Sequence, residues 1–189
     1  MLKLINKIFG KKTNSAKKSN SSLPVIKVPK LEELFFKHFN DLPYFKEKSF
    51  EIVLKHLKHE IDLNKSGRKL TAIEKKDLGL NARLSITSDL VAVLSEKGLQ
   101  LPDPKIALKQ VYYRATFEVT RIEKFQQMLS VGFTTAIYKS CRDERDCAWC
   151  KENDGVKFTV SEDLNTELNQ NCTCDWNRGF FAPEANFRK

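Results

Sequence analysis

Four cysteines in the last third of the chain constrain its fold more than any other feature of the sequence. Cys147 and Cys150 are separated by two residues, and after 21 further residues Cys172 and Cys174 are separated by one. Each close pair needs only a local turn to direct two sulfurs at one point, and zinc binds four thiolates tetrahedrally. The spacing therefore predicts one structural zinc ion held by these four cysteines.

Other interpretations of the cysteines stay open. The four thiols could pack in reduced form without a metal, hold an iron–sulfur cluster or, for Cys147 and Cys150, exchange with disulfides. The exchange role normally needs a strand followed by a helix, which the sequence does not indicate here. A fifth cysteine, Cys141, ends a predicted strand, and we expect it not to be a ligand. Five clustered cysteines do not resemble a secreted disulfide framework, so a reducing cytoplasm is the expected setting.

Polar residues crowd both sides of the first cysteine pair. Asp143 and Arg145 precede it, and Asp154 and Gly155 form a turn beyond it. We interpret these residues as structural supports that pair with each other or bind the loop backbone, with acid–base chemistry by the carboxylates as the alternative. All three histidines lie far upstream, so no catalytic residue is named. Enzymatic activity stays undecided, and a non-enzymatic role is the expectation.

The sequence predicts an α+β fold in which an N-terminal helical region precedes a small β-containing, cysteine-rich domain. The expected parts are a basic flexible tail and linker (1–30), a helical domain (31–131) and a zinc-knuckle-like domain (132–189). Residues 10–22 are too polar to bury much apolar surface, and this favours a linker.

Several helices and strands are predicted individually. Thr71 and Glu74 form a capping-box pair, residues 89–96 indicate an apolar helix that ends near Gly98, and residues 108–129 show the clearest helical period, with Gly132 as the stop. The β-branched and aromatic residues of 133–139 and 156–160 predict two short strands.

The net charge of +9 comes from one end of the chain. Eight lysines and no acidic residue lie in residues 1–30, which leaves 25 basic against 24 acidic residues elsewhere. Any contact with nucleic acid is therefore expected to begin at this tail. No segment is long and apolar enough to predict a membrane span.

Residues 132–183 contain, in this order, the motifs Asp143-Glu-Arg145, Cys147-Ala-Trp-Cys150, Asp154-Gly155, Phe158 and Asn171-Cys172-Thr-Cys174. This order of motifs resembles the C-terminal domain of the phage Mu F-like head-morphogenesis (minor capsid) proteins. The family has His-Pro where this chain has Asn169-Gln170, and Arg where it has Thr173. The two cysteine pairs complete a four-sulfur site without that histidine.

The resemblance implies a role in virion assembly, in head morphogenesis or DNA delivery. Portal or capsid components would then be the partners, and the protein would be found in the cytoplasm of a bacterial host or in the virion. Two other classes remain: a zinc-bearing bacterial module that binds protein or nucleic acid, and a toxin-like enzyme. A domesticated prophage remnant is also compatible with the sequence.

Overall fold

The structure is a computed structural model that describes residues 25–184, so most of the predicted basic tail lies outside the described residues. Helices predominate, and a small three-stranded antiparallel sheet lies near the C-terminus, which confirms the predicted α+β class. The elements are α1 (Leu31–Asp41), η1 (Glu47–Ser49), α2 (Phe50–Leu57), α3 (Ala72–Asp77), α4 (Ser88–Val93), α5 (Glu96–Leu99), α6 (Ile106–Ser130), β1 (Thr135–Lys139), α7 (Ala148–Glu152), β2 (Lys157–Thr159), α8 (Glu162–Asn171) and β3 (Phe180–Pro183).

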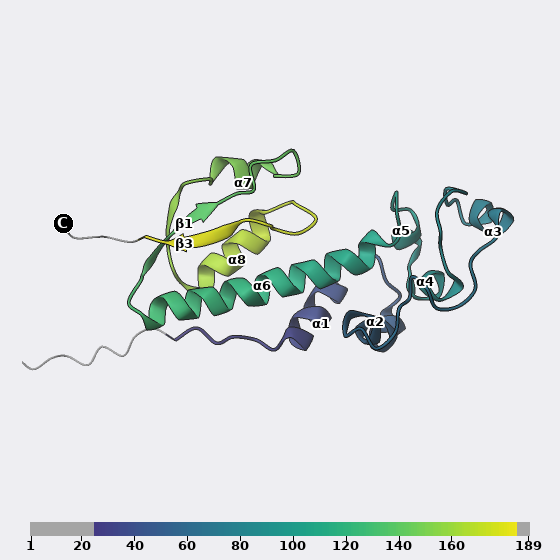
Figure 1. Ribbon diagram of the computed structural model, residues 1–189, viewed down its shortest axis with the longest axis horizontal. Coiled ribbons are helices and arrows are strands. Elements are labelled where there is room, and N and C mark those ends of the chain that lie inside the picture. Colours follow the sequence, from purple (N-terminus) through teal and green to yellow (C-terminus); the bar gives the residue numbers. More distant parts are fainter. Residues whose placement is uncertain (1–24, 185–189) are drawn as a thin grey trace, which may run out of the picture.

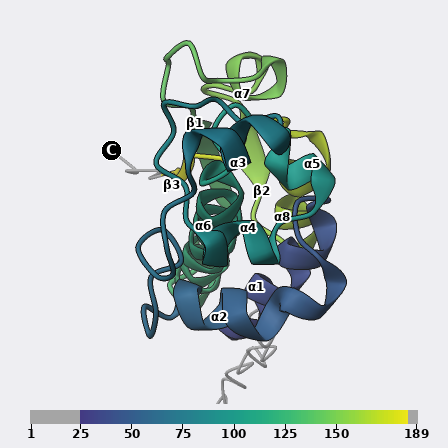
Figure 2. The ribbon, with the colours of Figure 1, turned by 90° about the vertical axis from the view of Figure 1, so that its right-hand side faces the viewer.

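Helix α6 is long and extends from the end of the molecule that carries the sheet to the neighbourhood of α5, and α3 and α4 lie beyond it (Figure 1). The predicted long helix is confirmed, and so is its stop. Gly132 adopts a φ of +86°, which favours glycine, and its N–H donates to the carbonyl of Leu129. Viewed from the end that carries α3 and α5, α6 lies between α7 on one side and α1 and α2 on the other (Figure 2).

The first hydrophobic cluster packs α1, α2 and α4 against the first half of α6. The predicted capping box of Thr71 and Glu74 is present at the start of α3. The predicted single helix over 89–96 is instead two helices, because Leu94 is extended and pairs with Phe45. Gly98 lies inside α5 rather than after it. A Cβ at this position would overlap the carbonyl oxygen of Tyr44, which explains why the residue is glycine.

The second hydrophobic cluster joins the second half of α6 to the sheet and α8. The strand order is β2-β1-β3, with Ala136 opposite Phe158 and Tyr138 opposite Phe181. Phe125 of α6 contacts Phe181 edge to face at a centroid distance of 5.0 Å. The sequence predicted β1 and β2 but neither β3 nor α8, and it therefore underestimated the core of this region.

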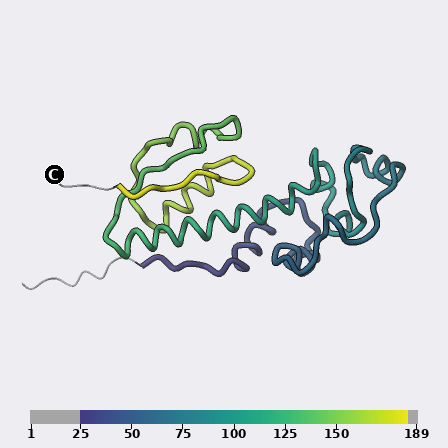
Figure 3. The backbone as a smooth tube through the Cα atoms, viewed as in Figure 1, coloured from purple at the N-terminus to yellow at the C-terminus, as the bar shows by residue number. Residues whose placement is uncertain are grey.

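Residues 25–30 lie alongside the second half of α6 (Figure 3). Ile26 is buried in the second cluster, and its N–H donates to the side chain of Gln126 at 2.6 Å. This part of the predicted linker is thus packed against the helix rather than free. Because α6 contributes to both clusters, the division of the chain at residue 131 stays a prediction.

Candidate metal centre

The first cysteine pair is positioned by the short helix α7. Cys147 is the residue before the helix, and Cys150 lies in its first turn, so the helical geometry directs both side chains to one side. Trp149 lies between them and contacts Tyr138 of β1 at a centroid distance of 5.1 Å. The aromatic contact holds the helix against the sheet.

The second cysteine pair is positioned by the end of α8. Ser161 caps this helix by accepting a hydrogen bond from the N–H of Leu164, and Leu164 and Leu168 bury one face of it in the second cluster. Cys172 follows the last residue of the helix, and Cys174 lies two residues further on. The packing of α8 therefore brings the second pair to the first.

The four sulfurs form one compact group. The Sγ of Cys172 lies 3.6 Å from that of Cys150 and 3.9 Å from that of Cys147, and the Sγ atoms of Cys150 and Cys174 are 3.8 Å apart. All four sulfurs lie within 4.8 Å of one another, and all four residues are free thiols. A tetrahedral ion bound to four sulfurs at about 2.3 Å keeps them about 3.8 Å apart, whereas a disulfide needs about 2.0 Å. The four cysteines are therefore close enough to hold one metal ion.

The surroundings of the cysteines shift the pKa values of their thiols in opposite directions. Burial alone would raise the pKa of Cys147, but the N–H groups of Cys150 and Thr173 stabilise its thiolate and lower that pKa to about 6. Burial raises the pKa of Cys150, and burial together with the charge of Cys172 raises the pKa of Cys174 to about 11. A bound cation would favour the thiolate form of all four, so binding releases protons.

Hydrogen-bond donors reach the sulfurs, and the side chains of Tyr138 and Asn177 come from outside the cysteine motifs. The hydroxyl of Tyr138 lies 3.2 Å from Sγ of Cys150. The side-chain amide of Asn177 lies 3.3 Å from the same sulfur, 3.4 Å from Sγ of Cys172 and 2.8 Å from the hydroxyl of Tyr138. The backbone N–H of Cys147 donates to Sγ of Cys174 at 3.3 Å. Such donors stabilise thiolate charge and orient the ligands.

Sequence reasoning missed Tyr138 and Asn177. The position of Asn177, three residues after the last cysteine, was an available signal, because a polar residue so close to a ligand often bonds to it. No local signal identified Tyr138. Its contact with the sulfur depends on the packing of β1 beside α7.

Asp143 and Arg145 lie on the segment that enters the first cysteine pair. Arg178 donates two hydrogen bonds of 2.6 Å to the carboxylate of Asp143 and holds its pKa far below the usual range. Arg145 lies 3.5 Å from the same carboxylate, and its carbonyl oxygen lies 3.4 Å from Sγ of Cys174. The ion pair of Asp143 with Arg178 joins the segment before the first cysteine pair to the segment after the second cysteine pair.

Asp154 and Gly155 shape the turn between α7 and β2 and do not contact a sulfur in the described part of the chain. Asp154 accepts hydrogen bonds from the N–H of Ser140 at 3.0 Å and from Nε of Arg142 at 2.8 Å. Gly155 has a φ of +86°, and its N–H donates to the carbonyl of Tyr138 at 2.8 Å. Cys141 is exposed and stands apart from the four-sulfur group.

Comparison with known proteins identifies no relative. No protein-family model matches the chain, and neither a curated protein nor a solved structure matches it. Within residues 25–184, no helix has the length and apolar character that crossing a membrane requires. The geometry of the cysteines therefore defines the class of site: it is a four-cysteine centre that joins the short helix α7 to the end of α8.

Proposed function

We propose that Cys147, Cys150, Cys172 and Cys174 hold one structural zinc ion. Four thiolates satisfy the tetrahedral preference of zinc and leave no open position for a substrate or a reactive water, which is the arrangement of structural sites. When bound, the ion supplies a cross-link between the start of α7 and the end of α8. The sulfur separations of 3.6 to 3.9 Å support this proposal most directly.

The proposal predicts one zinc per chain in protein purified without added metal, measured by inductively coupled plasma mass spectrometry. Removing the ion with a strong chelator should lower the melting temperature, and adding zinc should restore it. Cys172→Ser should lose the metal, whereas Cys141→Ser is the matched control and should keep it. Metal-free protein that melts at the same temperature as the zinc-loaded protein would refute the structural role.

We further propose that the protein acts as a phage or prophage minor head protein of the head-morphogenesis type. The support is that the motif residues follow the order typical of that family and lie in the region that carries the four cysteines. Asp143 lies in the network beside the cysteines, Asp154 and Gly155 shape the turn after α7, and the ring centroids of Phe158 and Trp149 are 6.3 Å apart. The partners would be portal or capsid components, with nucleic acid contacted through the basic tail, and the protein would pass from the bacterial cytoplasm into the virion.

This role can be tested with the particles produced by the phage or prophage that carries the gene. Mass spectrometry of purified particles should detect the chain in a low copy number, and deletion of the gene should lower the yield of DNA-filled heads. A chain that is absent from particles, with heads formed normally after deletion, would refute the assignment. The four-cysteine centre could still exist in that case, because the metal measurement is independent.

The second candidate is a zinc-bearing interaction module of a bacterial protein. Tyr113 and Phe117 of α6 favour it, because both aromatic side chains are more than a third exposed beside a cleft. Asp143 and Asp146, just before the first cysteine pair, are both paired with Arg178, and this favours a protein or small-molecule ligand over nucleic acid there.

A further inference from the structure

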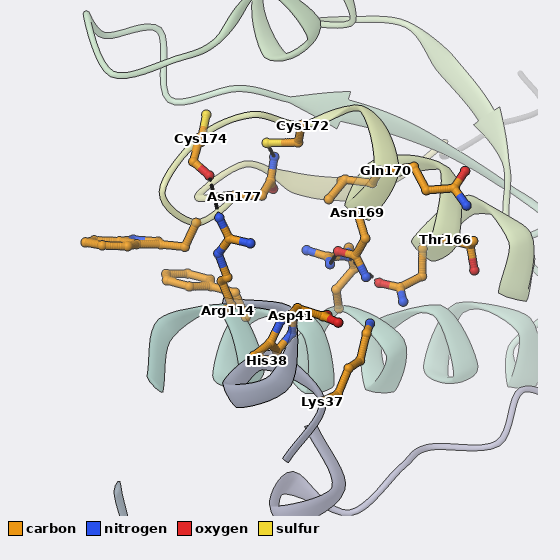
Figure 4. Close-up of a pocket in the computed structure, with 15 residues that line it drawn as sticks. Lys37, His38, Asp41, Arg114, Thr166, Asn169, Gln170, Cys172, Cys174 and Asn177 are labelled. Carbon is orange, nitrogen blue, oxygen red and sulfur yellow. Dashed lines mark hydrogen bonds and ion pairs between the residues drawn. The ribbon is translucent and has the colours of Figure 1, made fainter. Parts of the chain in front are cut away.

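A cleft of about 300 Å³ lies between α1, α6, α8 and the segment that carries the last two cysteines (Figure 4). It is separate from the cross-link proposed above, although Cys172 and Cys174 form part of its wall. Figure 4 shows Arg114 reaching from α6 to the carbonyl of Cys174, and Lys37 reaching from α1 on the other side of Asp41. The cleft thus combines residues from parts of the sequence that are far apart.

A buried carboxylate lies behind the cleft and is already neutralised. Glu118 is 3% exposed and accepts hydrogen bonds from Nζ of Lys37 at 2.8 Å and from the side chain of Asn165 at 3.0 Å. Its Oε2 lies 2.7 Å from Nε2 of His38. Three polar partners therefore satisfy Glu118, which leaves it little capacity to balance a further cation.

Arg121 is a buried cation without a carboxylate partner. Its side chain is 8% exposed and donates to the amide oxygens of Asn165 at 2.9 Å and Asn169 at 3.0 Å. Within residues 25–184, no carboxylate lies within 4.0 Å of it, and it donates to no cysteine sulfur. Burial lowers the pKa of Arg121, and the charges of Glu118 and Cys172 oppose that shift. A buried guanidinium in this state is stabilised by an anion.

A second guanidinium lies on the same face of α6. Arg114, seven residues before Arg121, donates to the carbonyl of Asp175 at 2.7 Å and has no carboxylate partner within the described residues. Lys37 adds a third cation, which is paired with Glu118 behind the cleft, and Asp41 is the carboxylate among the residues that line the cleft. Three cations therefore stand against two carboxylates, Asp41 and Glu118, which leaves one positive charge before the charge of the cysteine centre is counted.

Aromatic rings border the cations. Phe117, 36% exposed, and Trp176 both line the cleft. Tyr113 supports them, with ring centroids 4.8 Å from Trp176 and 6.2 Å from Phe117. The buried Asn177 is also among the lining residues, and its side-chain carbonyl oxygen has no hydrogen-bond partner among the described residues. Flat apolar surface and guanidinium groups thus meet in one place.

The geometry points to a ligand site in this cleft for a small molecule that joins an oxyanion, phosphate or carboxylate, to a flat ring. Arg114 and Arg121 bind the oxyanion, because planar guanidinium groups match phosphate and carboxylate oxygens. The ring packs against Phe117 and Trp176. The cavity volume is at the lower end of the range for small-molecule sites, which suits a ligand of the size of a nucleoside monophosphate.

The test uses the full-length, zinc-loaded chain with Trp149→Phe, so that Trp176 is the remaining tryptophan and its fluorescence reports on the cleft. Adenosine 5′-monophosphate is the probe that joins a phosphate to a ring, and benzoate is the probe that joins a carboxylate to a ring. Adenosine tests the ring without the oxyanion, and orthophosphate tests the oxyanion without the ring. We expect saturable binding of a ring-bearing oxyanion, with each half binding on the order of tenfold more weakly. Isothermal titration calorimetry confirms the affinities without the tryptophan signal.

Matched variants assign the binding to the cleft. Arg114→Gln should weaken binding on the order of tenfold and Phe117→Ala should weaken it as well, whereas Arg83→Gln removes an exposed arginine elsewhere and should not. Melting temperature and zinc content establish that each variant is folded. No binding up to about 1 mM, equal binding by Arg114→Gln and Arg83→Gln, or binding of a single-stranded oligonucleotide without the mononucleotide would overturn the proposal.

Discussion

Substitution of Asn177 tests whether hydrogen bonds to the cysteine sulfurs strengthen metal binding. Its side-chain amide is the only one among the described residues that donates to two of the cysteine sulfurs, at 3.3 and 3.4 Å. Both distances are long, and zinc binding converts the acceptor sulfurs to thiolates, so each bond contributes about 0.5–1.5 kcal/mol in the metal-bound state. Asn177→Ala should therefore cost about 1–3 kcal/mol of metal binding, which corresponds to a zinc affinity roughly 5 to 150 times weaker.

The charge of the replacement extends this prediction. Asn177→Asp should weaken binding further than Asn177→Ala, because it places a carboxylate beside four thiolates whose charge already exceeds that of one divalent ion. The control is Asn171→Ala, since the Asn171 amide lies one residue before a ligand but donates to the carbonyl of Glu167 at 2.8 Å.

The affinities are measured by competition with a chromophoric zinc chelator at constant pH. An affinity for Asn177→Ala within about twofold of the wild type and of Asn171→Ala would refute the reasoning, because it would mean that the N–H···S contacts contribute no net free energy. A fall in both asparagine variants alike would also refute it, since the effect would then not depend on contact with sulfur.

Three further predictions concern stability. Burial alone would raise the pKa of Glu118, but hydrogen bonds from His38 and Lys37 outweigh it and lower that pKa to about 2. The stabilising contribution of Glu118 is therefore present above its unfolded pKa of 4.5 and is lost as the pH falls toward 2. Urea unfolding should show the wild type losing about 3 kcal/mol over that range relative to Glu118→Gln, and parallel pH profiles of the two proteins would contradict this. Thr71→Ala removes the capping box of α3 and should cost about 1 kcal/mol in unfolding free energy, and an unchanged value would show that α3 frays independently. Gly98→Ala should cost roughly 1–3 kcal/mol, because the added methyl group meets the backbone of Tyr44, and an unchanged melting temperature would show that the chain adjusts without strain.

Local patterns were sufficient for the elements whose signals lie within a few residues. The capping box of Thr71 and Glu74, the repeat of apolar residues in α6 and the stop at Gly132 all depend on neighbours in the sequence. The break between α4 and α5 was missed because it depends on the pairing of Leu94 with Phe45, 49 residues away. β3 was missed for a similar reason, because its partner β1 lies 40 residues upstream.

α8 is a different case, since its signal was local and available. Ser161 is a common N-cap residue, acidic residues follow it in the first turn, and Leu164 and Leu168 have helical spacing. Without α8, the region between the cysteine pairs was read as strand and loop, and the C-terminal core was underestimated.

The sequence by itself determined the four candidate ligands, because two close cysteine pairs need only local turns to present their sulfurs. The tertiary structure alone decided which side chains support those sulfurs, and it brought Tyr138 and Asn177 to the centre from β1 and from the loop before β3. It also placed Lys37, Arg114 and Arg121 around one cleft. Hydrogen bonds and charge interactions act over a few ångströms in space, whereas residues that share a site can be separated by most of the chain.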